Sequence, residues 1–146
     1  MKDKKENVGT KNNKVNESDF LFGNNRGPEI LKALDNISIE VNNKIKMRGI
    51  SRGLICIVED FNKNILSLEK IITHAYRSRD FEEKLDLIES TNTPLEDMWL
   101  DIRYLLKNKG LTIGEVGVLS EQAFKVQEQI QKWNNSTRTK AMESQG

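Results

Sequence analysis

Residues 54–75, LICIVEDFNKNILSLEKIITHA, decide the fold class of this chain. Apolar residues recur there at alternating steps of four and three, the spacing of one face of an α-helix. This stripe consists of Leu54, Val58, Phe61, Ile65, Leu68, Ile72 and Ala75. It lasts about three heptads, which favours left-handed packing against other helices at shallow angles. A lone helix leaves such a stripe in water, so the stretch predicts a helix near residues 50–79 inside a bundle.

The helix before it is delimited by one proline and two glycines. Pro28 suits the first turn of a helix, because the N–H that proline lacks would have no partner there. A helical stripe of apolar residues follows as far as Ile45, and Gly49 and Gly53 then mark a turn. We therefore expect the first helix near residues 28–47.

The third segment is helical but interrupted. It covers residues 80–109 and is expected to break near Pro94, since residues 93–96, TPLE, have the form of a capping box with proline at the first helical position. Gly110 follows the last periodic residues and is the expected C-terminal cap. The sequence thus favours a short helix and a longer one that abut.

The fourth helix is expected at residues 112–135, opening with the capping box TIGE. Four amphipathic segments with short connections predict an all-α, up-down antiparallel four-helix bundle over residues 28–135. Residues 1–27 and 136–146 lack this periodicity, so both are expected to be disordered tails. The first tail is either a solvated leader or an arm that orders on a partner through Phe20-Leu21-Phe22. The predicted core comprises Leu54, Val58, Phe61, Ile65, Leu68, Ile72, Leu105, Val116, Leu119, Val126 and Ile130.

Composition restricts the class of protein further. The chain has 146 residues, which is enough for one domain. Of these residues 36% are hydrophobic and 31% are charged, a composition that suits helices with one apolar stripe each. No apolar run approaches the ~18 residues of a membrane span, and the N-terminus lacks the apolar core of a signal peptide. We therefore expect a cytoplasmic protein with no membrane contact.

No group of residues has the spacing of a catalytic, metal or cofactor site. His74 is the only histidine, and Cys56, the only cysteine, excludes an internal disulfide. We expect Cys56 to be a packed small side chain. Adjacent acids such as Glu82 and Glu83 diverge on a helix, and no glycine-rich phosphate loop is present. The sequence predicts a protein that is not an enzyme and uses no cofactor or metal.

Charge is distributed unevenly along a chain whose net charge is +1. Residues 80–101 contain eight acids and one base, whereas residues 41–58 contain no acid and four bases, Lys44, Lys46, Arg48 and Arg52. This basic junction between the first two helices suits contacts with phosphate groups, and the alternative is a solvated turn. Arg103, next to Ile102 in an apolar run, is expected to be partly buried and paired with an acid or with a neighbouring subunit.

The second half of the chain combines PLEDMWLDIRYLLKNKG, a short turn and a helix of the form V-x-x-L-x-x-x-A-x-x-V-x-x-x-I-x-x-W. This order resembles the accessory variability determinant proteins of diversity-generating retroelements, within a wider four-helix-bundle family that includes proteins encoded in ribosomal RNA intervening sequences. Arg48-Gly49-Ile50 with Arg52 also looks like the basic junction of that family. The residues that carry the resemblance are Leu95, Ile102, Arg103, Tyr104, Leu105, Thr112, Val116, Val126, Ile130 and Trp133.

The resemblance implies a non-catalytic homopentamer that binds a reverse transcriptase and its template RNA, and so supports mutagenic cDNA synthesis. Members of that family are usually strongly basic, whereas this bundle is only locally basic. We therefore expect contact with RNA or polymerase through a few residues of the basic junction. The alternative is a self-associating four-helix scaffold, or a regulator such as an antitoxin, without a nucleic-acid role.

Overall fold

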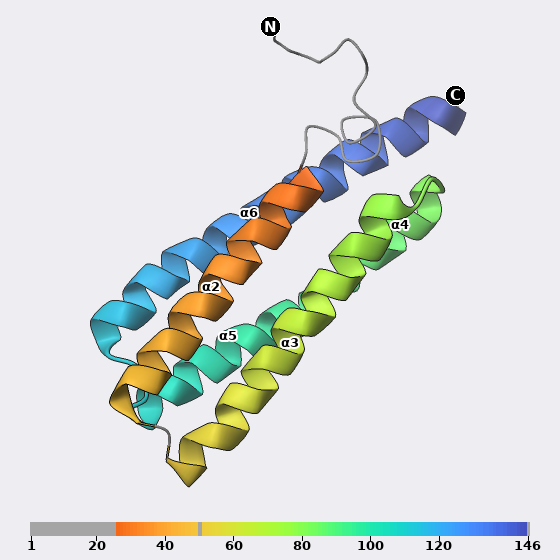
Figure 1. Cartoon of the computed structure of the whole chain (residues 1–146). Coiled ribbons are helices and arrows are strands. Elements are labelled where there is room, and N and C mark those ends of the chain that lie inside the picture. The colour runs from red at the N-terminus through yellow and green to blue at the C-terminus, as the bar shows by residue number, and fades with distance from the viewer. Residues whose placement is uncertain (1–25, 50, 146) are drawn as a thin grey trace, which may run out of the picture.

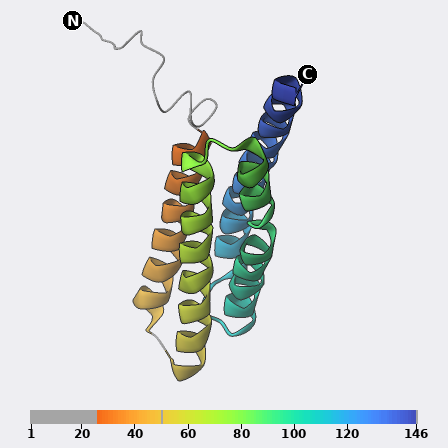
Figure 2. The same ribbon diagram turned by 90° about the vertical axis from the view of Figure 1, so that its right-hand side faces the viewer.

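The computed structural model describes residues 26–49 and 51–145 and shows an all-α bundle (Figure 1). Its elements are α2 (Arg26–Arg48), α3 (Arg52–Arg77), α4 (Phe81–Glu89), α5 (Asn92–Lys107) and α6 (Ile113–Gln145). Helix α3 packs against α2, α4 and α5, and α6 packs against the same three helices. Because α4 and α5 follow one another along one side, they together take the place of one long helix (Figure 2). The predicted antiparallel four-helix architecture is confirmed.

The core is built from the predicted stripe of α3 and matching stripes on its neighbours. Phe61, near the middle of α3, is fully buried, and every core residue predicted from the sequence is buried as well. Removing an aliphatic or aromatic side chain of this kind from water contributes about 1.5–3 kcal/mol, so these stripes hold the helices together. The other helices add Ile30, Leu34, Ile37, Val41 and Ile45 from α2, Met98 and Ile102 from α5, and Trp133 from α6.

The break in the third segment is confirmed, but it lies earlier than the sequence predicted. Helix α5 begins at Asn92, so residues 93–96 lie within its first turn and are not the capping box that was expected. Thr91 occupies the break, where its buried hydroxyl donates to the carbonyl of Ile88 at 2.6 Å. Pro94 still falls in the first turn, where its missing N–H leaves no hydrogen bond unmade.

The predicted C-terminal tail is wrong, because α6 continues to Gln145 and its last turns extend past the other helices (Figure 2). The buried stripe of α6 runs beyond Trp133 to Thr137, which is only 4% exposed. Thr137 is polar, so the apolar pattern ends although the helix does not. The hydroxyl of a second threonine, Thr139, donates a hydrogen bond to the carbonyl oxygen of Asn135 at 3.0 Å within the helix.

Two further predictions concern the N-terminal segment and the cysteine. Residues 1–25, including Phe20-Leu21-Phe22, lie outside the described residues, while Gly27, which the sequence assigned to the tail, already belongs to α2. Cys56 is exposed, so the prediction that it is packed in the core is wrong. It lies two residues from Leu54 on α3, and two helical steps of 100° turn it away from the core stripe.

The turn between α2 and α3 and the turn between α5 and α6 lie at the same end of the bundle (Figure 1). Gly49 reverses the chain after α2 with a φ of 83°, a left-handed conformation that favours glycine. After α5, Lys109 is left-handed with a φ of 66°, and the Gly110 N–H donates to the carbonyl of Leu105 at 2.7 Å. A Cβ on Gly110 would lie 2.8 Å from Cδ1 of Ile45. Glycine is therefore needed at 110 because the turn packs closely on the core.

Candidate functional site

Figure 1 shows that α2 and α5 terminate, and α3 begins, at the same end of the bundle, and basic residues of the sequence fall at these helix ends. We call these residues the basic end, and they are Lys46, Arg48, Arg52, Lys107 and Lys109. All five are exposed. The antiparallel topology thus joins the predicted basic junction to two lysines far from it in the sequence.

Arg48 ties the end of α2 to the start of α6. Its Nη1 donates to Oε1 of Glu115 at 2.6 Å and to the carbonyl oxygen of Gly110 at 3.0 Å, and its Nη2 donates to Oε2 of Glu115 at 2.6 Å. The hydrogen bond from Arg48 is the main reason that the pKa of Glu115 falls to about 2. The same interaction raises the pKa of Arg48 above its ordinary value. Arg48 is therefore a structural clamp whose charge is compensated.

The predicted capping box at the start of α6 completes this clamp. The Thr112 N–H donates to Oε1 of Glu115 at 2.9 Å, and the Glu115 N–H donates to Oγ1 of Thr112 at 3.2 Å. These two bonds confirm the box read from TIGE. The Glu115 carboxylate thus accepts hydrogen bonds from both the Thr112 N–H and the guanidinium of Arg48. These bonds fix where α6 begins relative to α2.

Of the four predicted contact residues, Arg48 and Lys44 are paired with acids, and Lys46 and Arg52 are not. Lys44 lies one turn before the end of α2 and forms an ion pair with Glu40, with Nζ and Oε1 3.9 Å apart. Lys46 and Arg52 are exposed and form no ion pair with any described residue. Sequence reasoning missed Lys107 and Lys109, although an up-down bundle requires the C-terminus of α5 to lie beside that of α2. The free cations of the site are therefore Lys46, Arg52 and these two lysines, within the part of the chain that the structure describes.

The prediction that Arg103 is partly buried is wrong, because its side chain is exposed. The core side of α5 is set by Ile102 and its helical neighbours, and one further residue turns the side chain away by 100°. Arg103 has no ion pair within the described residues. The buried polar position on this helix belongs instead to Asp101, which is 6% exposed.

Two carboxyl pairs lie on either side of α3. Asp101 of α5 accepts a hydrogen bond from Nδ2 of Asn64 at 3.0 Å, and burial together with a hydrogen bond to Asp60 raises its pKa to about 7. Between α2 and α3, burial and a hydrogen bond to Asp35 raise the pKa of Glu69 to about 7. Two adjacent carboxyl groups cannot both ionise at low cost, so each pair holds a proton near neutral pH.

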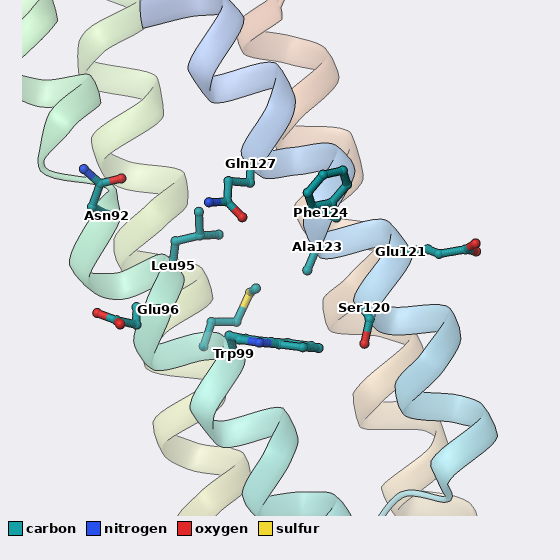
Figure 3. A pocket seen from close by; sticks show the side chains of 10 residues that line it. Asn92, Leu95, Glu96, Trp99, Ser120, Glu121, Ala123, Phe124 and Gln127 are labelled. Carbon is teal, nitrogen blue, oxygen red and sulfur yellow. The ribbon is translucent and has the colours of Figure 1, made fainter.

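A groove of about 710 Å³ lies between α5 and α6 (Figure 3). Trp99 and Leu95 point into it from α5, and Phe124 stands at its α6 side with 61% of its surface exposed. Glu96 and Glu121 point outward from its two edges. The lining comprises Asn92, Leu95, Glu96, Met98, Trp99, Ser120, Glu121, Ala123, Phe124 and Gln127.

Part of the α6 wall of the groove is made of small side chains. Ser120 and Ala123 line it, and a Cβ built on Gly117, one turn earlier, would meet nothing within 4 Å. Sequence reasoning missed the groove. The available signal was Phe124, an aromatic residue next to the core stripe of α6 but outside it, at helical spacing from Gly117 and Ser120.

Comparison with protein-family models, with curated proteins and with solved structures finds no match for this chain. Among the described residues, no cluster of three or more His, Cys, Asp and Glu side chains is placed to hold a metal ion. No helix in the same part of the chain is both long and apolar enough to cross a membrane. The class that the structure defines is a four-helix bundle with a basic end and an apolar groove.

Proposed function

We propose that this protein is a non-catalytic binding subunit whose basic end holds a polyanionic partner. The partner in this proposal is the template RNA of a reverse transcriptase, as in the accessory proteins of diversity-generating retroelements that the sequence resembles. The observation that carries the proposal is the gathering of exposed cations from α2, α3 and α5 at one end of the bundle. Four of them, Lys46, Arg52, Lys107 and Lys109, have no acidic partner among the described residues.

The basic end suits phosphate better than base recognition. Its cations are long, exposed side chains on helix ends and a turn, with no aromatic residue among them to stack on bases. Each phosphate that they neutralise releases bound counterions, so affinity comes mainly from salt-sensitive contacts. One copy offers only a few such contacts. Assembly of several copies, a homopentamer in the family that the chain resembles, would repeat them and add avidity.

The test measures binding of a fluorescent single-stranded RNA, alone and with a candidate reverse transcriptase, across a series of salt concentrations. The triple variant Lys46→Glu, Arg52→Glu, Lys109→Glu reverses three of the four unpaired cations of the basic end without touching the Arg48 clamp. We expect it to weaken binding more than tenfold and to lower the log–log salt slope by about 0.7 for each phosphate that the variant no longer neutralises.

The matched control carries the same charge change at the opposite end of the bundle. It is Arg77→Glu, Arg79→Glu, Arg138→Glu, at three exposed positions, and it should bind RNA within about threefold of the parent, since distant exposed charges are largely screened. If both triple variants lose affinity equally, binding depends on overall charge and the basic end is no site. If neither loses any, a scaffold without a nucleic-acid role becomes the better account.

A further inference from the structure

The side of α5 that points away from the core carries apolar residues and cations in alternation. We call it the outer face of α5, and it consists of Leu100, Arg103, Tyr104 and Lys107. These four residues follow the spacing i, i+3, i+4 and i+7, so they share one side of the helix. All four are exposed, whereas Ile102 on the core side is fully buried. The face starts at the basic end, because Lys107, the last residue of α5, belongs to both.

Tyr104 presents an aromatic ring to solvent beside two cations. Its exposed fraction is 51%. Arg103 precedes it directly, and Lys107 follows it by three residues, or about 4.5 Å of helix rise. Neither of these cations forms an ion pair with any described residue. Proteins that bind single-stranded nucleic acid use this combination, since an aromatic ring stacks on a base while cations hold the backbone.

We infer that Tyr104 stacks on a base of the RNA, and that the strand held at the basic end continues along the outer face of α5. The inference rests on the proposed function, since it needs the basic end to hold RNA. It adds a second kind of contact, because the exposed cations bind phosphates and the ring of Tyr104 binds a base. Arg103 extends the row of cations one turn beyond Lys107. Every base has a π face, so this stacking selects single strands without selecting a sequence.

Acidic residues limit how far the strand follows α5. Glu96 and Asp97 lie one turn before the outer face begins, and their carboxylates repel phosphate. The contact is therefore confined to the last turns of α5, from Arg103 to the basic end. It also stays clear of the α5–α6 groove, which has Glu96 and Glu121 at its edges and no lysine or arginine among its described lining residues.

The test compares two fluorescent probes of equal length and charge, a single-stranded RNA and an abasic oligonucleotide that has the same phosphates but no bases. Binding of each probe to the full chain is measured by fluorescence anisotropy at one low salt concentration. The parent should bind the RNA about tenfold more tightly than the abasic probe, because only the RNA can stack. Tyr104→Ala should bind the two probes equally within about twofold, whereas Tyr104→Phe, which keeps the ring, should retain the preference.

Two further variants separate stacking from charge and from general exposure of an aromatic ring. Arg103→Gln removes one phosphate contact, so it should weaken binding of both probes by the same factor and lower the log–log salt slope by about 0.7. Phe124→Ala removes another aromatic ring, which is 61% exposed at the side of the acidic-edged groove, and should leave both affinities unchanged. Because these positions are exposed, circular dichroism should report the helix content of the parent for each variant.

The outcomes distinguish failure of this inference from failure of the proposed function. A parent that binds neither probe overturns both. The inference alone is overturned if reversal of the basic end weakens RNA binding but Tyr104→Ala keeps the preference of the parent for RNA over the abasic probe. It is also overturned if the parent binds the two probes equally, or if Tyr104→Phe or Phe124→Ala loses the preference as fully as Tyr104→Ala does.

Discussion

Replacing Asp101 by Asn should stabilise the protein above neutral pH and leave it unchanged in acid. Asp101 is buried beside Asp60, and its pKa is raised from 3.8 to about 7. An acid whose pKa is higher in the folded state binds its proton more tightly there. Its contribution to stability is therefore fully present below about pH 4 and lost as the pH rises through about 7. Asn at 101 carries no charge at any pH and remains able to bond Asn64.

The magnitude follows from the rise in the pKa of Asp101. A rise from 3.8 to about 7 corresponds to about 4 kcal/mol in the absence of screening, and water at the edge of the pair reduces this to about 1–2 kcal/mol. With a urea m-value of about 1–3 kcal/mol/M, the unfolding midpoint of Asp101→Asn at pH 8 should rise by roughly 0.5–1 M. At pH 5, which lies about a third of the way from 3.8 to 7, the rise in the midpoint should be correspondingly smaller, about 0.2–0.4 M.

The assay is urea unfolding followed by circular dichroism at both pH values, with Asp86→Asn as the control. Asp86 is an exposed carboxyl on α4, so its replacement should change neither midpoint. The reasoning about the buried pair is refuted if Asp101→Asn and Asp86→Asn behave alike at pH 8, or if Asp101→Asn shifts the midpoint equally at pH 5 and pH 8.

Two further variants test the core and the clamp. Phe61→Ala empties the middle of the core and should lower the free energy of unfolding by about 3–5 kcal/mol, which calorimetry would record as a melting temperature lower by roughly 6–20 °C. The control Leu66→Ala, on the exposed face of α3, should lower the melting temperature by no more than about 2 °C. Equal losses in the two variants would place Phe61 outside the core. Arg48→Gln removes the guanidinium that holds the pKa of Glu115 at about 2, so carboxyl-detected NMR should show Glu115 titrating at a clearly higher pH than in the parent. An unchanged titration would mean that Arg48 does not govern this carboxyl.

The parts of the fold that sequence predicted are those encoded by local periodicity. The stripe through Phe61 specified α3 because each apolar residue lies one helical turn from the next, whatever the rest of the chain does. The capping box from Thr112 to Glu115 was equally local and is present. The same reliance on apolar spacing ended α6 too early, since Thr137 continues the buried stripe with a polar side chain.

The features that sequence did not predict depend on contacts between distant residues. Arg48 was expected to be free for phosphate, but Glu115, 67 positions away, compensates its charge. Lys107 and Lys109 join the basic end only through the direction of α5. The groove depends on how far α5 stands from α6, a distance that no pattern within either helix encodes. Charge and periodicity in the sequence predicted core residues and candidate binding residues. The topology of the bundle determined which of these residues lie together.

The central claim, that the basic end is the binding surface, is tested most directly by two-dimensional amide NMR of the full chain titrated with single-stranded RNA. We predict that resonances of Lys46, Arg52, Lys107 and Lys109 shift together and saturate at one stoichiometry, and that added salt reverses the shifts. Resonances at the opposite end, such as those of Arg77 and Arg79, should not move. Shifts confined to the opposite end, or spread evenly over the surface, would contradict the claim.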